Sequence, residues 1–153
     1  MRKLILAFLI STSMSAVAQK ANFSGNWLID KSKTNFDHAA EWVVPKIIKV
    51  DQQAGKLILT RINIDNQQQE QTPVTETLAF DGTPFQRTPT AGNTVTTTLN
   101  WQNDQSFILV RNGTQTATET WTQENNGKTL VVNRVVALAD GRQYTIKCYY
   151  SKQ

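Results

Sequence analysis

Glu119 and Arg134 are the two residues of this sequence whose types and spacing could carry out chemistry together. They belong to two runs of β-forming residues separated by Asn126-Gly127, a strong signal for a short hairpin loop. Counting outward from that loop predicts that Glu119 lies opposite Arg134. If this face is the interior, the charges must be paired, because an unpaired buried charge is costly. We interpret Arg134 as an anchor for an acidic group of a ligand, held in place by Glu119; a purely structural ion pair is the alternative.

Successive turn signals at Asn103-Asp104, Asn112-Gly113 and Asn126-Gly127 predict which side chains share this face. The predicted inward face consists of Val95, Leu99, Trp101, Ile108, Val110, Ala117, Glu119, Trp121, Leu130, Val132, Arg134 and Val136. The opposite face carries Arg111, Asn133 and eight threonines, a composition that suits a solvated sheet surface.

Tyr144 joins the candidate site only under one register of the last hairpin. A three-residue loop at 139–141 pairs Leu138 with Arg142 and turns Tyr144, Cys148 and Tyr150 inward. A two-residue loop turns them outward. We favour the first register because it keeps the apolar face continuous.

All four tryptophans, Trp27, Trp42, Trp101 and Trp121, fall on the apolar phase of their predicted strands. Such a set can line a cavity for an apolar ligand or simply fill a core. We select Trp27, Trp101 and Trp121 as candidate contacts for the apolar part of a ligand.

Other reactive groups are sparse. His38 and Cys148 are the only residues of their types, which is too few for a zinc site of His and Cys ligands. We therefore predict no metal, no cofactor and no catalysis, with Cys148 packed as a small hydrophobic residue. A pair of acids, Glu76 and Glu119, could serve a glycosidase only if their separation were right, which a sequence does not give.

The N-terminus predicts export. Arg2 and Lys3 precede an apolar run and the small-residue site Ala16-Val17-Ala18, the pattern of a cleaved signal peptide over residues 1–18. We expect a periplasmic or secreted monomer without stable membrane insertion. The basic residues are scattered, so the net charge of +4 gives no case for nucleic-acid binding.

Short strands with a turn signal after each, and no long helical pattern, predict an all-β domain over residues 19–153. We expect a single antiparallel up-and-down meander of eight to ten strands that closes into a barrel, which removes exposed edges. Residues 83–92 contain two prolines and a glycine and are predicted to form a loop or portal flap.

The segment Phe23-Ser-Gly-Asn-Trp27 resembles the first strand of the lipocalin and fatty-acid-binding (calycin) superfamily, which carries a Gly-x-Trp motif. Residues 23–36 and 119–150 resemble the small exported lipocalin-like domains of bacteria more specifically. The matching elements are Lys31-Ser32 and the late pair Trp121-Thr122 and Asn126-Gly127-Lys128-Thr129-Leu130. The resemblance implies a lipocalin-like meander barrel that binds a small apolar molecule, or a domain of undetermined role.

Three departures from that superfamily affect the site. Residues 31–41 are too short for the helical lid of fatty-acid-binding proteins. Arg142-Gln143-Tyr144 resembles their carboxylate-binding Arg-x-Tyr motif, but it starts the last strand instead of ending it. The basic residue that braces the first-strand tryptophan in calycins could here only be a lysine from the segment 147–152.

These observations predict an exported binding protein for a small hydrophobic or amphipathic molecule. Arg134, Glu119 and Tyr144 would orient a polar head group, and the three tryptophans would contact the apolar part. The alternative is a non-enzymatic envelope or secreted interaction module with a filled core and no ligand.

Overall fold

The computed structural model describes residues 19–89 and 92–153. The predicted signal peptide, residues 1–18, lies outside this range, as do residues 90–91 of the predicted 83–92 loop. The strands are β1 (Gly25–Ile29), β2 (Ile47–Gln53), β3 (Lys56–Ile62), β4 (Val74–Ala79), β5 (Phe85–Arg87), β6 (Val95–Asn103), β7 (Ser106–Asn112), β8 (Thr116–Glu124), β9 (Thr129–Ala137) and β10 (Gln143–Lys152), with one 3-10 turn, η1 (Glu41–Val43).

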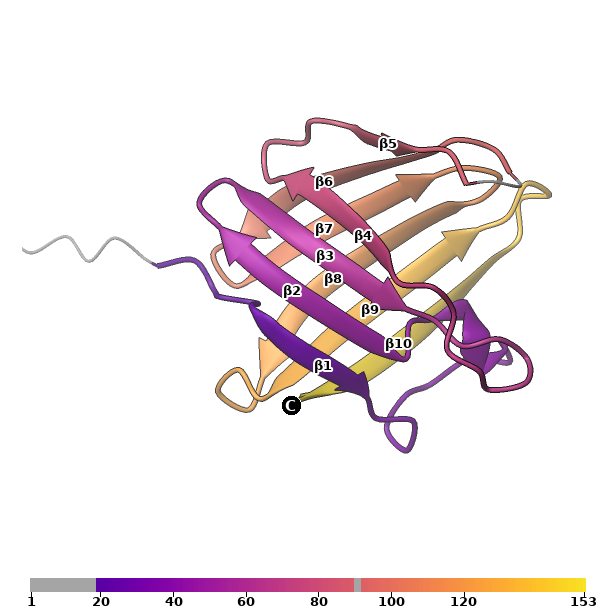
Figure 1. Cartoon of the computed structure of the whole chain (residues 1–153), viewed down its shortest axis with the longest axis horizontal. Coiled ribbons are helices and arrows are strands. Elements are labelled where there is room, and N and C mark those ends of the chain that lie inside the picture. Colours follow the sequence, from indigo (N-terminus) through magenta and orange to yellow (C-terminus); the bar gives the residue numbers. More distant parts are fainter. Residues whose placement is uncertain (1–18, 90–91) are drawn as a thin grey trace, which may run out of the picture.

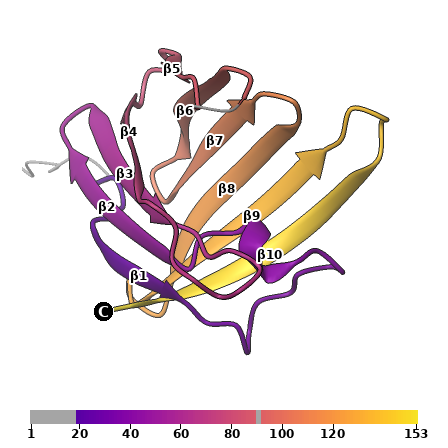
Figure 2. The same cartoon turned by 45° about the vertical axis from the view of Figure 1, so that its right-hand side comes forward.

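All ten strands belong to one antiparallel sheet in the order β4-β3-β2-β1-β10-β9-β8-β7-β6-β5. The sheet curls round so that β4 approaches β5 and β6, where a single bridge joins Asp81 to Asn100 (Figures 1 and 2). The predicted up-and-down meander is confirmed as a nearly closed barrel. Within the described ranges, no helix is both long and apolar enough to cross a bilayer.

The two hairpins that position the predicted site have the predicted registers. Glu119 pairs with Arg134 across β8 and β9. Ile146 pairs with Arg134 across β9 and β10, as the three-residue loop requires. Gly141 adopts φ +84° in that loop, a left-handed conformation that glycine reaches without a side-chain clash. Tyr144, Cys148 and Tyr150 therefore do lie on the inward phase.

The predicted register of β7 was wrong. A bulge in β6 pairs Trp101 with Phe107, and a longer loop pairs Asn112 with Thr116. Each change shifts the register by an odd number of residues, so β7 shows its other face to the interior while β8 keeps the predicted one. The inward residues of β7 are Phe107, Leu109 and Arg111, not Ile108 and Val110. Both faces of this strand are apolar, so alternation alone could not choose between them.

Trp42 was also placed wrongly. It lies in η1 and not on a strand, and 47% of its surface is exposed. The strand resumes only at Ile47, because Pro45 has no N–H to donate to a sheet ladder.

One end of the barrel is packed with aromatic rings, which we call the aromatic cluster: Phe23, Phe80, Trp101, Phe107 and Trp121. Phe107 stacks on Trp121 with ring centroids 5.1 Å apart and meets Phe23 edge-on at 4.7 Å. Trp27 is fully buried beside this cluster, and its indole N–H donates to the Phe23 carbonyl at 3.0 Å.

Lys152 lies over the Trp27 ring at 5.2 Å, which confirms the expected lysine brace from the end of the chain. Cys148 is a buried free thiol, as predicted, and burial raises its pKa to about 12. Burial also raises the pKa of Tyr150 well above its ordinary value. The Tyr150 hydroxyl donates to the Pro45 carbonyl at 3.1 Å, which ties β10 to the segment before β2.

Candidate functional site

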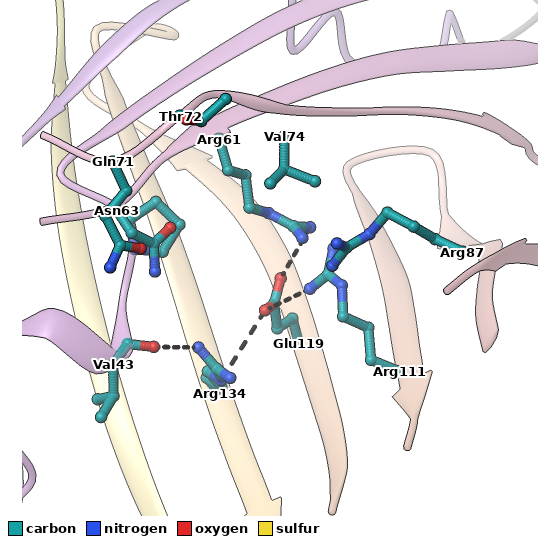
Figure 3. A pocket seen from close by; sticks show the side chains of 11 residues that line it. Val43, Arg61, Asn63, Gln71, Thr72, Val74, Arg87, Arg111, Glu119 and Arg134 are labelled. Atoms are coloured by element: carbon teal, nitrogen blue, oxygen red, sulfur yellow. Dashed lines mark hydrogen bonds and ion pairs between the residues drawn. The ribbon is translucent and has the colours of Figure 1, made fainter. Parts of the chain in front are cut away.

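A polar pocket of about 310 Å³ occupies the opposite end of the barrel interior from the aromatic cluster. Four arginines from four strands converge on it: Arg61 from β3, Arg87 from β5, Arg111 from β7 and Arg134 from β9 (Figure 3). Its remaining lining is Val43, Pro45, Asn63, Gln71, Thr72, Val74 and Glu119. We call the four arginines together with Glu76 and Glu119 the arginine cluster.

The predicted pair Glu119–Arg134 is present in this pocket. The Arg134 Nε lies 3.9 Å from the Glu119 Oε1, at the outer limit of an ion pair. The Arg134 Nη1 donates to the Val43 carbonyl at 2.6 Å, so η1 holds the guanidinium in place. Arg134 is thus oriented by backbone more than by the carboxylate opposite it.

Two other arginines bind the carboxylates more closely. Arg111 donates to Glu119 at 2.9 Å and to Glu76 at 3.0 Å. Arg61 donates to Glu76 at 3.1 Å and lies 3.7 Å from Glu119. Each of these arginines therefore bridges the same two carboxylates, and both glutamate side chains are at least 95% buried.

Each of the four carboxylate oxygens accepts at least one hydrogen bond. The second oxygen of Glu76 accepts from the Thr97 hydroxyl at 3.1 Å, and that of Glu119 accepts from the Trp121 indole N–H at 3.0 Å. General acid-base chemistry by the pair Glu76 and Glu119 would need an oxygen free to reach a substrate.

Several guanidinium N–H groups have no hydrogen-bond partner. These buried atoms are the Nε and Nη2 of Arg61, the Nε of Arg87 and the Nε of Arg134. Across residues 19–89 and 92–153, no carboxylate lies within ion-pair distance of Arg87. Buried donors without partners carry a desolvation cost.

The other predicted site residues do not line this pocket. Trp27 and Trp121 are fully buried in the apolar half of the interior, and Trp101 stacks on Phe80 at 4.6 Å. Tyr144 borders a separate hollow beside His38 and the residues before η1. Only Glu119 and Arg134 of the six reach the pocket directly, and Trp121 reaches it through its hydrogen bond to Glu119.

Sequence reasoning missed Arg87 and Arg111 and gave Arg61 no role. A signal for all of them exists, because alternate strands of an up-and-down barrel run in the same direction. Four odd-numbered strands, β3, β5, β7 and β9, place an apolar residue two positions before an inward arginine: Leu59-x-Arg61, Phe85-x-Arg87, Leu109-x-Arg111 and Val132-x-Arg134. The shared direction brings the four arginines to one end.

No group of three or more His, Cys, Asp or Glu side chains that could hold a metal ion occurs in the described part of the chain. The arginine cluster supplies cationic donors, which are suited to carboxylate, phosphate or sulfonate groups.

Solved structures with a similar fold include two lipid-type binding proteins. The chain superposes on a Schistosoma mansoni fatty acid binding protein in complex with arachidonic acid, with a TM-score of 0.61 and 15% identity, covering 86% of this chain and 96% of that one. It also superposes on a zebrafish ileal bile acid-binding protein complexed with cholic acid, with a TM-score of 0.58 and 12% identity, covering 86% and 98%. The likeness shows that the chain shares the barrel fold of these two proteins. No family model and no curated protein matches the sequence.

At such low identity the calycin-type likeness describes the fold and leaves the site to be judged by its own residues. In this chain, η1 is three residues long and occupies the position between β1 and β2. It also contributes Val43, which binds Arg134, so the short connection is part of the pocket wall.

Proposed function

We propose that this protein is an exported, monomeric, non-catalytic binding protein for a small amphipathic acid. The acidic group is bound by Arg134 and its neighbouring arginines, and the apolar part rests against Val43, Pro45 and Val74. The observation that carries the proposal is the convergence of four arginines, with two carboxylates against them, on a pocket of about 310 Å³. This volume is at the lower end of the range for small-molecule sites.

Two further observations support binding of an amphipathic molecule. The solved structures with this fold include one in complex with arachidonic acid and one with cholic acid, both of which join a carboxylic acid to an apolar frame. The pocket of this chain has few apolar walls. The ligand we propose is therefore shorter than a long-chain fatty acid.

Intrinsic fluorescence tests the proposal, since the Trp121 indole N–H donates to Glu119 inside the arginine cluster. We expect octanoate to change the emission saturably and octanol to bind much more weakly. The substitution Arg134→Ala should weaken octanoate binding by roughly tenfold or more, which is the contribution of a charge-assisted contact. Its effect on octanol should be small.

Arg142→Ala is the matched control, because Arg142 is 78% exposed, pairs with Asp140 and does not line the pocket. It removes the same charge from the chain and should leave octanoate binding unchanged. If octanoate and octanol bind alike, or if both substitutions have the same effect, the acidic anchor is refuted.

Export is proposed from residues 1–18, whose basic start, apolar run and Ala16-Val17-Ala18 site have the form of a signal peptide. N-terminal sequencing of the protein from its native source should begin at Gln19. A chain that begins at Met1 would contradict this part of the proposal.

The alternative function is an interaction module without a ligand. It is favoured by the filled core around the aromatic cluster and by the exposure of Trp42, the chain neighbour of Val43 in the pocket lining. A flat response to every acid tested would favour this alternative over the carrier.

A further inference from the structure

The arginine cluster contains more positive than negative charge. Four guanidinium groups face two carboxylates, which leaves an excess of two positive charges. The side chains of Arg61, Arg111 and Arg134 are 11% to 21% exposed. Charge held at this depth requires counter-charge or strong solvation, because desolvation penalises an unpaired ion.

The two neutralised arginines can be distinguished from the two in excess. Arg61 and Arg111 each bridge Glu76 and Glu119, so these four side chains form a neutral ring. Arg87 has no carboxylate within ion-pair distance among the described residues, and Arg134 has only the 3.9 Å contact to Glu119. The excess therefore resides on Arg87 and Arg134.

In the sheet, Arg87 and Arg134 lie on opposite sides of strands β7 and β8, which carry Arg111 and Glu119 of the neutral ring. Arg134 is on β9, Glu119 on β8, Arg111 on β7 and Arg87 on β5 at the edge of the sheet. In Figure 3, Arg134 and Arg87 reach toward Glu119 from different walls of the pocket. Each carries a buried Nε without a hydrogen-bond partner.

We propose that the pocket selects a small organic dianion, with Arg134 binding one negative charge and Arg87 the other. This inference rests on the proposed function and narrows its ligand class from acids in general to doubly charged acids. Two acidic groups on a short carbon frame and a phosphate monoester share this chemistry. The neutral ring between Arg87 and Arg134 fixes the walls of the site and contributes no net charge.

A six-carbon series separates charge from size. Isothermal titration of the intact mature chain at pH 8 would compare 1,6-hexanediol, hexanoate, adipate and hexyl phosphate, which carry none, one, two and two negative charges. We expect adipate or hexyl phosphate to bind at least tenfold more tightly than hexanoate, and the diol to show no binding. A higher affinity for adipate than for hexyl phosphate identifies a ligand with two separated acidic groups. The reverse order identifies a ligand with one doubly charged group.

Substitution of Arg87 tests the residue assignment. Arg87→Gln should reduce the affinity for the preferred dianion to within about twofold of that for hexanoate, while hexanoate binding changes little. Arg134→Gln should weaken the binding of hexanoate and of the dianion to a similar degree. Arg142→Gln, which removes an exposed arginine outside the pocket, should alter none of these affinities.

The outcomes separate the two proposals. Equal binding of hexanoate and both dianions would refute selection for two charges while leaving an acid-binding function intact. Absence of binding by every acid would refute both. A dianion preference that survives Arg87→Gln would remove Arg87 from the site, and circular dichroism of each variant would confirm that the barrel is folded.

Discussion

The two ends of the barrel interior differ in what their buried side chains do for the fold. At one end, the aromatic cluster removes apolar surface from water and packs ring against ring. At the other, the arginine cluster buries four cations with two carboxylates and leaves guanidinium N–H groups without partners. The first arrangement stabilises the fold, while the second costs stability. Interiors usually retain such a costly arrangement at sites of function.

The aromatic cluster and the arginine cluster meet at Trp121 and Glu119 on β8. Trp121 and Glu119 are inward neighbours on β8, and the indole N–H of one donates to the carboxylate of the other. The packed end therefore holds a carboxylate of the charged end in a fixed orientation. We expect the following three changes to separate the contributions of the two ends.

The largest effect should come from the aromatic cluster. Phe107→Ala removes a fully buried ring that contacts four other aromatic residues, and should lower the free energy of unfolding by about 3–5 kcal/mol. Urea unfolding followed by circular dichroism measures this loss. Phe107→Leu should lose less, because it leaves a smaller cavity. A loss under about 1 kcal/mol for the alanine variant would show that this end is not tightly packed.

A smaller loss should follow from breaking the neutral ring. Arg111→Met deprives Glu76 and Glu119 of a shared partner and should cost roughly 1–3 kcal/mol, less than a fully buried pair because the pocket admits water. Arg87→Met is the matched control. It removes a cation without a carboxylate partner in the described ranges and should be neutral or slightly stabilising in urea unfolding. Equal losses in both variants would contradict the division between neutralised and excess arginines.

The smallest effect should appear only in alkaline solution. Because the folded-state pKa of Cys148 is raised from 9.0 to about 12, the unfolded chain loses this proton first as the pH rises. The stabilising contribution is complete below pH 9 and falls by about 1.4 kcal/mol per pH unit above it. Urea unfolding at pH 8 and pH 10 should show the decline, and Cys148→Ala should make it shallower. Part of the pH dependence should remain in that variant, because the pKa of Tyr150 is also raised. If the stability of Cys148→Ala falls with pH as steeply as that of the unmodified protein, the assignment to Cys148 is contradicted.

The sequence was enough to predict the barrel and two members of the arginine cluster, Glu119 and Arg134. Turn residues at Asn126-Gly127 and Gly141 fixed the registers that place Arg134 opposite Glu119 and turn Tyr144 inward. These features are local, since a loop and its two strands set them. The amphipathic alternation of β8 and β9 then selected the inward face.

The tertiary structure decided the rest. Which face of β7 is buried depended on a bulge in β6 and on a three-residue loop, 113–115, after Asn112. Neither has a distinct signal in a strand that is apolar on both faces. Arg61, Arg87 and Arg111 come from strands that are distant in sequence, and only the curl of the sheet brings them to one end. Neighbouring residues thus determined the strands and their turns, whereas barrel closure determined which charges meet and which of them lack a partner.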